Sequence, residues 1–448
     1  MRAPLSDLLV SVLERATARG ATAADGFLIE EREFGALVRL GDVERVTHSR
    51  DQRLSLRVFV GRASAAASTS DLSPASLERV VDEATRLARV TAEDPHAGLP
   101  DPGELIDRIP DLDLEDTSGE ELVPEDKIAI ARRAEAAALA VDSRLANSEG
   151  AEYSDRNAHY VYATSSGFAA SYSTSGFSLS VTPVAGENGE MQRDYWYTAA
   201  RKRAKLEDPE TVGRTAAARA LRRLGARKVK TVEVPVIFDA ENAASLVRSI
   251  AGAASGPSLY RRASFLVERL GTRIAAPSVT IVDDGLIPGA LGSRPFDGEG
   301  LATRRTVLVD GGTLESYLLD SYSARRLGGR STHHAARDGG GVTVGTTNLM
   351  LLPGTASPED LIVSVDNGLY VTELIGFGVN GVTGDYSRGA VGLWIENGRL
   401  AYPVDEVTVA GNLLEMFAAV DGVANDLVLR GRTASPTLKI ARMVVAGN

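Results

Sequence analysis

Strand-forming segments dominate the second half of the chain, and they constrain the fold more than any other feature. After Gly271, short apolar runs alternate with turn residues, the pattern typical of strands. Helical patterns are few and do not alternate regularly with these strands, which favours an α+β fold over a doubly wound α/β fold. The predicted strands in this half are 231–238, 278–283, 305–310, 313–319, 343–351, 362–365, 369–375, 391–400 and 438–445, with a last strand-helix stretch from 404.

The first half mixes helices and strands. Ser73 and Pro74 predict the start of a helix, because Ser is a favoured N-cap and Pro fits the first helical position. Asp208 and Asp239 are predicted to cap two later helices in the same way. The predicted helices are 4–19, 74–90, 124–141 and 208–225, and the predicted strands are 25–31, 34–40, 53–60 and a β-rich segment, 144–200.

The chain has 448 residues, which is too long for one ordinary domain. We expect an N-terminal α+β region, 1–228, and a β-rich C-terminal domain, 229–448. Residues 91–120 are acidic and rich in Pro and Asp, as a connector would be. The first region is therefore alternatively two units, 1–95 and 120–228, joined by an acidic linker.

Composition excludes several classes of protein. The chain contains no cysteine, so disulfides, thiolate nucleophiles and cysteine-ligated zinc are excluded. A net charge of −11 argues against broad nucleic-acid binding. No apolar run is long enough for a membrane span. Because no secretory signal is visible at the N-terminus, we expect a cytoplasmic location.

A pair of histidines, His333 and His334, lies in the Gly-rich segment 330–341. The pair could bind a metal or contact a ligand, and the alternative is an exposed loop. Neighbouring side chains point apart on most backbones, so two ligands to one metal are geometrically awkward. The remaining histidines support no second cluster, because they are scattered along the chain at His48, His96 and His159.

Other candidate groups have simpler structural explanations. Two carboxylate pairs, Asp283–Asp284 and Asp405–Glu406, could serve acid/base chemistry, although turn and surface roles are commoner. Residues 201–230 hold eleven Lys or Arg against three acidic residues, which is either an acidic-partner surface or a solvated helix face. The glycines of 376–384 suit turns between strands. No His or acid is placed by sequence to activate the turn serines, Ser165, Ser166 and Ser175.

Several segments together resemble one known family. These segments are 65–74, 254–265, 279–285, 296–300, 317–328, 368–376 and 384–398. They resemble the TldD/PmbA family, once named modulators of DNA gyrase, and specifically its PmbA (TldE) branch. The resemblance spans nearly the whole chain.

The resemblance implies that a metal site of the TldD branch is absent here. In that branch a helix carries His-Glu-x-x-x-His, and a later Cys completes a zinc site, where zinc activates water and the Glu acts as base. Aligned on the shared Gly252, these positions hold Arg248, Ser249 and Ala253, and the chain has no Cys. The resemblance therefore implies no cofactor in this chain, and zinc in a partner subunit.

The family further implies a heterodimer with a TldD-like zinc peptidase, acting on unfolded or modified peptides bound as an extended strand. We expect this chain to bind the partner and enclose the substrate, without catalytic residues of its own. Self-association without the partner is an alternative. Two other functions stay open: an independent hydrolase with a non-zinc site, and a non-proteolytic regulator that binds gyrase or another protein. The predicted peptide path comprises His333, His334, Arg337, Glu373, Gly376, Gly378 and Asn380.

Overall fold

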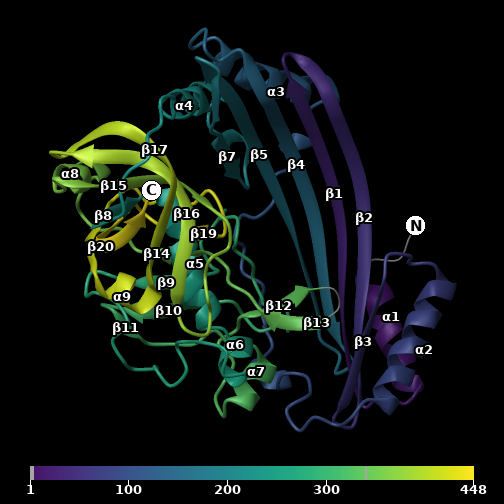
Figure 1. Ribbon diagram of the computed structural model, residues 1–448. Helices are drawn as coiled ribbons and strands as arrows, with labels where there is room; N and C mark the ends of the chain where they lie inside the picture. Colours follow the sequence, from purple (N-terminus) through teal and green to yellow (C-terminus); the bar gives the residue numbers. More distant parts are fainter. Residues whose placement is uncertain (1–4, 339–340, 448) are drawn as a thin grey trace.

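The computed structural model describes residues 5–338 and 341–447. Its N-terminal part is built on one long antiparallel sheet with the strand order β3-β2-β1-β4-β5-β6, and β7 pairs with β5 (Figure 1). The strands are β1 (Ala23–Arg39), β2 (Asp42–Val60), β3 (Ala63–Thr69), β4 (Asn147–Thr164), β5 (Ala169–Glu187), β6 (Glu190–Arg193) and β7 (Trp196–Ala200). Because β1 pairs with β4, the segments before and after the acidic connector share one sheet.

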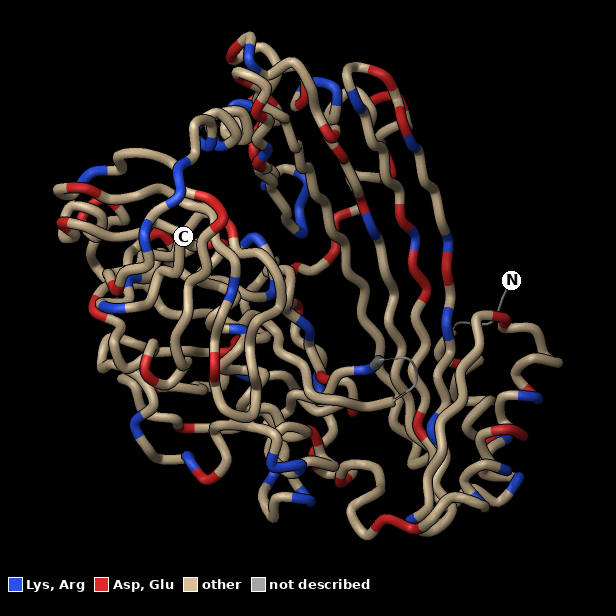
Figure 2. Tube along the Cα trace, viewed as in Figure 1, with Lys and Arg blue, Asp and Glu red and all other residues tan. Residues whose placement is uncertain are grey.

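One continuous strand, β1, replaces the two strands predicted at 25–31 and 34–40. The polar run from Glu30 to Glu33, which includes the gap between the two predicted strands, interrupts the apolar pattern but stays paired with both β2 and β4. They lie in the middle of the sheet, between the two ends that helices cover, and Figure 2 shows charged residues along this part of the long strands. Exposure of this middle section explains why strand pairing tolerates the polar run.

Four helices cover one face of the sheet at its two ends. Leu28 belongs to the core formed with α1 (Leu5–Ala18) and α2 (Pro74–Val90). Phe34 belongs to the core formed with α3 (Pro124–Leu139) and α4 (Pro209–Leu221). Side chains alternate along a strand, so Leu28 and Phe34 share a face, whereas Phe27 lies on the opposite one. Phe27 packs with Tyr162 and with Phe296 of the C-terminal part.

The predicted helix caps are confirmed. The Ser73 hydroxyl accepts a hydrogen bond from the Ser76 N–H at the start of α2. Asp208 accepts from two backbone N–H groups of α4, and Asp239 accepts from the Asn242 N–H of α5 (Ala240–Ala253). Each cap satisfies a donor that the first helical turn would otherwise leave unpaired.

The C-terminal part contains two sheets with α5 packed against both. In the first sheet β17 pairs with β16 and also with β20, so five of the strands close into a ring. Its strands are β8 (Val232–Phe238), β15 (Asn367–Ile375), β16 (Asp385–Glu396), β17 (Arg399–Asn412), β18 (Val420–Val423) and β20 (Leu438–Ala446). The second sheet comprises β9 (Ile281–Asp284), β10 (Arg305–Asp310), β11 (Thr313–Leu314), β14 (Leu349–Leu351) and β19 (Thr433–Ala434).

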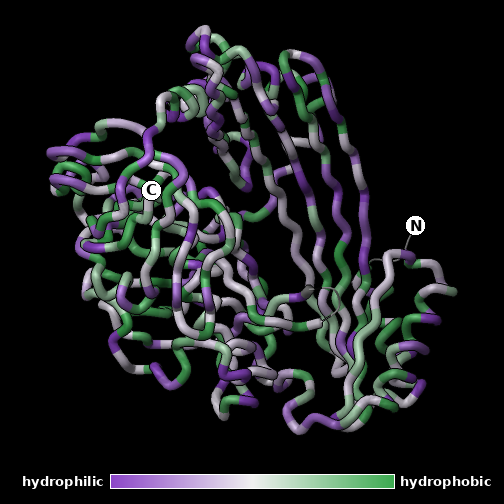
Figure 3. The backbone as a smooth tube through the Cα atoms, in the orientation of Figure 1, coloured by the Kyte–Doolittle hydropathy of each residue, from purple (hydrophilic) through white to green (hydrophobic). Residues whose placement is uncertain are grey.

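Short helices and one hairpin complete the C-terminal part. The hairpin of β12 (Ala335–Asp338) and β13 (Gly341–Val344) extends toward the long N-terminal sheet (Figure 1). Green, hydrophobic segments concentrate inside the C-terminal part and where α1 and α2 cover the sheet (Figure 3). The short helices are α6 (Gly256–Tyr260), α7 (Ser321–Arg326), α8 (Pro358–Val363) and α9 (Leu413–Ala418).

The α+β class and the β-rich C-terminal part are confirmed, but some local predictions are wrong. Residues 362–365 are not a strand, because Ser357 and Asp360 form a capping box that starts α8. The predicted strand 343–351 is two strands, and only Thr313–Leu314 of 313–319 is extended in a sheet. Residues 391–400 span the end of β16, a turn and the start of β17.

Candidate functional site

The helix α5 places the three expected metal-site positions in different surroundings. Arg248 is exposed, and Ser249 is half-buried, with its hydroxyl donating to the Ser245 carbonyl over 3.0 Å. Ala253 is buried in the core of the C-terminal part. A guanidinium, a hydroxyl bonded to its own helix and a methyl group do not fit a zinc site, which takes imidazole, thiolate or carboxylate ligands.

No group of three or more His, Asp or Glu residues is arranged to hold a metal ion anywhere in 5–338 or 341–447. The donor atoms of a zinc site are therefore missing from α5 and are not supplied by another described segment.

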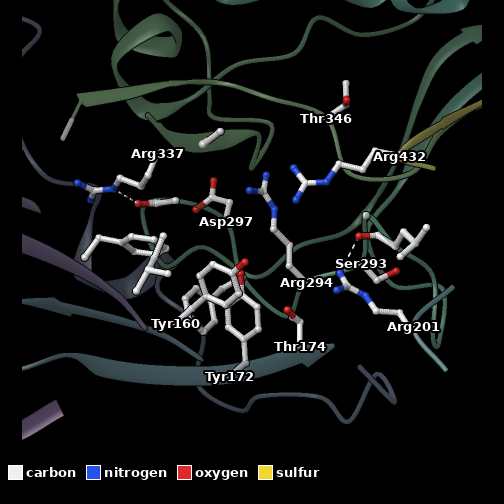
Figure 4. A pocket seen from close by; sticks show the side chains of 17 residues that line it. Tyr160, Tyr172, Thr174, Arg201, Ser293, Arg294, Asp297, Arg337, Thr346 and Arg432 are labelled. Carbon is white, nitrogen blue, oxygen red and sulfur yellow. Dashed lines mark hydrogen bonds between the residues drawn. The ribbon is translucent and has the colours of Figure 1, made fainter. Parts of the chain in front are cut away.

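A pocket of about 220 Å³ lies between the long sheet and the C-terminal part (Figure 4). One wall is aromatic: Tyr160 and Tyr172 stack with ring centroids 4.9 Å apart, and Tyr172 meets Phe296 edge-on at 5.1 Å. The other lining side chains are mainly polar. The lining residues are Phe27, Ile29, Tyr160, Tyr172, Thr174, Arg201, Leu291, Gly292, Ser293, Arg294, Phe296, Asp297, Gly298, Ala336, Arg337, Thr346 and Arg432.

Four arginines line this pocket against one carboxylate, that of Asp297. Arg201 is buried, and its guanidinium donates to the carbonyl oxygens of Ser175 and Leu291, over 2.6 Å each. Burial lowers the pKa of Arg201 to about 10, and the charge of Arg432 acts in the same direction. Among the described residues, no carboxylate forms an ion pair with Arg201 or Arg432.

Arg294 attracts the Asp297 carboxylate, but part of its guanidinium has no acceptor within the part of the chain that the structure describes. Its Nε and Nη2 atoms are buried without a hydrogen-bond partner there. Burial raises the pKa of the Tyr172 hydroxyl to about 12, while the charges of Arg294, Arg201 and Arg432 oppose that rise. The three cations therefore act on the same tyrosine, and Figure 4 shows the guanidinium groups of Arg294 and Arg432 side by side, with Arg201 beside Ser293.

The fourth arginine, Arg337 on β12, belongs to a buried ionic cluster at the edge of the pocket. It donates to Asp25 of β1 over 2.5 Å and to the Gly298 carbonyl over 2.6 Å. Arg57 of β2 forms two hydrogen bonds to the same Asp25 carboxylate, 2.7 and 2.9 Å long, and lies 3.4 Å from Glu299. This cluster connects the N-terminal sheet to the C-terminal part.

The side chains of His333 and His334 lie in different surroundings, as those of neighbouring residues usually do. His334 is buried, with Nε2 3.1 Å from Asp283 and Nδ1 2.9 Å from the Thr332 hydroxyl. His333 has a positive φ of 61°, and its Nδ1 lies 2.7 Å from the Ala302 carbonyl. Burial lowers the pKa of His333. Neither residue lines the pocket, whereas Arg337 from the same segment does.

The other predicted path residues lie on or after β15 and do not line the pocket. Glu373 forms an ion pair of 2.5 Å with Arg223. The Gly378 carbonyl accepts from the Ser387 N–H at 2.7 Å, and an added Cβ would lie 1.5 Å from Ser387. Gly376 has a positive φ of 78°, and the Asn380 side chain accepts from the Val382 N–H. Whether either segment contacts a peptide stays a prediction.

The carboxylate pairs have structural roles. Asp283 is fully buried and accepts two hydrogen bonds from Thr347 besides facing His334. Its neighbour Asp284 lies 3.9 Å from Arg305. At the second pair, Glu406 is exposed and forms a 2.6 Å ion pair with Lys228.

Ion pairs neutralise much of the basic segment 201–230. Arg219 and Arg222 both lie within 4 Å of Asp194, and Lys202 lies 2.6 Å from Asp113. Such internally paired charges do not form a free surface for phosphates. No described helix is both long and apolar enough to cross a lipid bilayer.

Comparison with known proteins finds family models that match three successive segments of the chain. Family models described as PmbA/TldA metallopeptidase domain 1, central domain and C-terminal domain match residues 24–88, 118–224 and 231–447. Metalloprotease PmbA of Escherichia coli O157:H7 is 39% identical over 446 residues, covering 99% of this chain and 96% of that protein. The chain belongs to the PmbA/TldD metallopeptidase family.

Other proteins are similar to this chain in sequence or in fold. A PmbA homologue from Haemophilus influenzae is 36% identical, covering 97% of this chain and 94% of that protein. A Bacteroides thetaiotaomicron protein named as a modulator of DNA gyrase has a TM-score of 0.92 at 30% identity, covering 99% and 98%. TldE from Thermococcus kodakarensis, at 21% identity, shares the fold with a TM-score of 0.88, covering 98% and 100%.

Sequence reasoning missed three of the four pocket arginines. Arg201, Arg294 and Arg432 stand in three distant segments with no shared motif. Each is an ordinary basic residue near a turn, so no local signal distinguishes it. Only the packing of the C-terminal part on the sheet brings the three together.

Proposed function

We propose that this chain is a non-catalytic, TldE-type subunit of a TldD/TldE metallopeptidase that cleaves unfolded or modified peptides. A TldD-like partner supplies the zinc and the catalytic residues. This chain binds that partner and encloses the substrate, and it works in the cytoplasm without a cofactor of its own.

The observation that carries this proposal is the chemistry of α5. Arg248 and Ala253 occupy the positions where zinc-binding histidines would stand, and Ser249 stands in place of the general base. Zinc hydrolases need three protein ligands and an open position for water. A chain of this family without those groups is suited to support catalysis in a partner.

A free strand edge supports the binding of substrate as an extended strand. β3 pairs with β2 only from Leu54 to Val60. From Asp42 to Arg53, β2 pairs with β1 on one side, and no described strand pairs with it on the other. Exposed backbone N–H and C=O groups along such an edge can pair with a peptide of any sequence, which suits a peptidase that selects for disorder.

A paired assay of peptide cleavage and zinc content tests the proposal. The purified chain is measured alone and then mixed with the TldD-like protein from the same source. We expect no stoichiometric zinc and no cleavage from the chain alone, and strong activation in the mixture. An Arg248→Ala variant is expected to support cleavage as well as the unchanged chain, because Arg248 takes no part in the chemistry.

The rival functions give different results in this assay. Cleavage by the chain alone would overturn the proposal in favour of an independent hydrolase. A partner that is equally active with and without this chain would favour a non-proteolytic regulator. Metal-stripped partner serves as the control, since its mixture with this chain should be inactive.

A further inference from the structure

The pocket between the sheet and the C-terminal part has the properties of an anion site. Arg201, Arg294 and Arg432 line one space of about 220 Å³, and none of the three forms an ion pair among the described residues. The molecule as a whole carries a charge of −11. Three cations close together face a single carboxylate in this pocket, that of Asp297. Such an excess of positive charge costs free energy, and a bound anion would offset that cost.

The donors are arranged for a planar oxyanion. Two Arg294 nitrogens, Nε and Nη2, are buried and lack acceptors in the described chain. All three Arg201 nitrogens donate to carbonyl oxygens, those of Ala290, Ser175 and Leu291, which fixes the guanidinium and leaves one N–H on each terminal nitrogen. Arginine forms parallel hydrogen bonds to carboxylates, and such charge-assisted bonds are stronger than neutral ones.

The aromatic wall of the pocket indicates which chemical group the ligand carries next to its anionic group. Tyr160, Tyr172, Phe27 and Phe296 form an apolar surface beside the arginines. A ligand with a carboxylate next to a hydrophobic side chain would satisfy both walls at once. The volume suits one terminal residue rather than a longer stretch of chain.

We infer that this pocket binds the C-terminal carboxylate of a peptide and packs the terminal side chain against the tyrosines. The inference rests on the proposed function in one respect, that the ligand is a peptide. The site would hold the end of the substrate in the subunit that performs no chemistry, so that the cleaved bond lies in the partner.

Direct binding to the purified full-length chain tests the inference. The probes are an N-terminally fluorescent hexapeptide of Gly and Ser ending in Phe, the same peptide as its C-terminal amide, and inorganic phosphate. We expect the free acid to bind at least about tenfold more tightly than the amide, because the amide forms no charge-assisted hydrogen bonds. Equal binding of acid and amide would overturn the inference, as would phosphate binding more tightly than the free acid.

Variants locate the binding. Arg294→Gln and Arg432→Gln are each expected to weaken binding of the free acid by about tenfold or more and to leave the amide unchanged. Arg399→Gln, at an exposed position on β17 outside the pocket, is the matched control. Unchanged binding in both pocket variants would contradict the site. The comparison of acid with amide on the unchanged chain stays decisive even if a variant fails to fold.

This test is separable from that of the subunit role. Peptide binding needs neither the partner nor zinc, so failure of the paired cleavage assay leaves the carboxylate site standing. Conversely, if the free acid binds no more tightly than the amide, the carboxylate site is ruled out and the proposed subunit role is unaffected.

Discussion

Asp297 shows how a single buried carboxylate responds to the pocket around it. It accepts hydrogen bonds from the backbone N–H groups of Glu299, Leu301 and Ala335. Burial raises the pKa of Asp297 to about 6, and the charge of Glu299 acts in the same direction, against the attraction of Arg294. The carboxylate organises the loop that forms one wall of the pocket, at a cost in stability when it is ionised.

Stability is expected to depend on the ionisation of Asp297. The folded chain keeps this proton up to about pH 6, whereas the unfolded chain releases it near 3.8. The contribution of Asp297 is therefore most favourable below pH 4 and is lost as the pH rises to 6, by about 3 kcal/mol. Chemical denaturation at pH 4 to 7 should show this loss relative to an Asp297→Asn variant. The exposed Asp366→Asn is the control, and a pH-independent difference between the unchanged chain and Asp297→Asn would contradict the expectation.

At the scale of elements, α5 combines a buried position between the two C-terminal sheets with side chains that do not fit a zinc site. One face packs into the core through residues such as Leu246, Val247 and Ile250. Ala253 ends the helix on that buried face, and its carbonyl accepts from the Ser264 hydroxyl over 2.6 Å. The helix is thus retained as a packing element between the two sheets.

Introducing a histidine on α5 should affect the stability of the chain differently at two positions. Ala253→His places an imidazole in a filled core and is expected to cost about 1–3 kcal/mol. Arg248→His, on the exposed side of the same helix, should stay within about 0.5 kcal/mol. Denaturation midpoints of the two variants provide the measurement. Equal stability of both would show that the core accommodates a ligand at 253.

At the scale of the whole molecule, a buried ionic cluster joins the long sheet to the C-terminal part. Arg57 and Asp25 come from the sheet, whereas Arg337 and Glu299 come from the C-terminal part. Although burial acts to raise it, Arg337 and Arg57 hold the pKa of Asp25 at about 2. The arrangement fixes the two walls of the pocket relative to each other.

Removing the shared carboxylate should therefore weaken the whole structure. Asp25→Asn leaves Arg57 and Arg337 buried with less compensation, and about 3–5 kcal/mol of stability should be lost. Glu152→Gln breaks an exposed ion pair with Arg45 on the same sheet and should cost at most about 1 kcal/mol. Urea denaturation measures both. If the two losses are similar, the cluster does not hold the parts together.

Local signals in the sequence were sufficient for the class of fold and for several element boundaries. Ser73, Asp208 and Asp239 mark helix starts through interactions within three residues, so no distant partner is needed. The same locality explains an error: the polar residues at 32–33 predict a break between two strands, because pairing with β2 and β4 is not visible in one segment. The family, too, was recognisable from the sequence alone, and the comparisons confirmed it.

Only the tertiary structure reveals the pocket. The sequence determined that α5 lacks zinc ligands, since ligand chemistry is a property of each side chain. The sequence could not place Arg201, Arg294 and Arg432 together. These residues meet only because the C-terminal part packs on the concave face of the long sheet, whose strands lie between residues 23 and 200. Side-chain identity is local, whereas the energetic cost and use of a charge depend on which distant groups surround it.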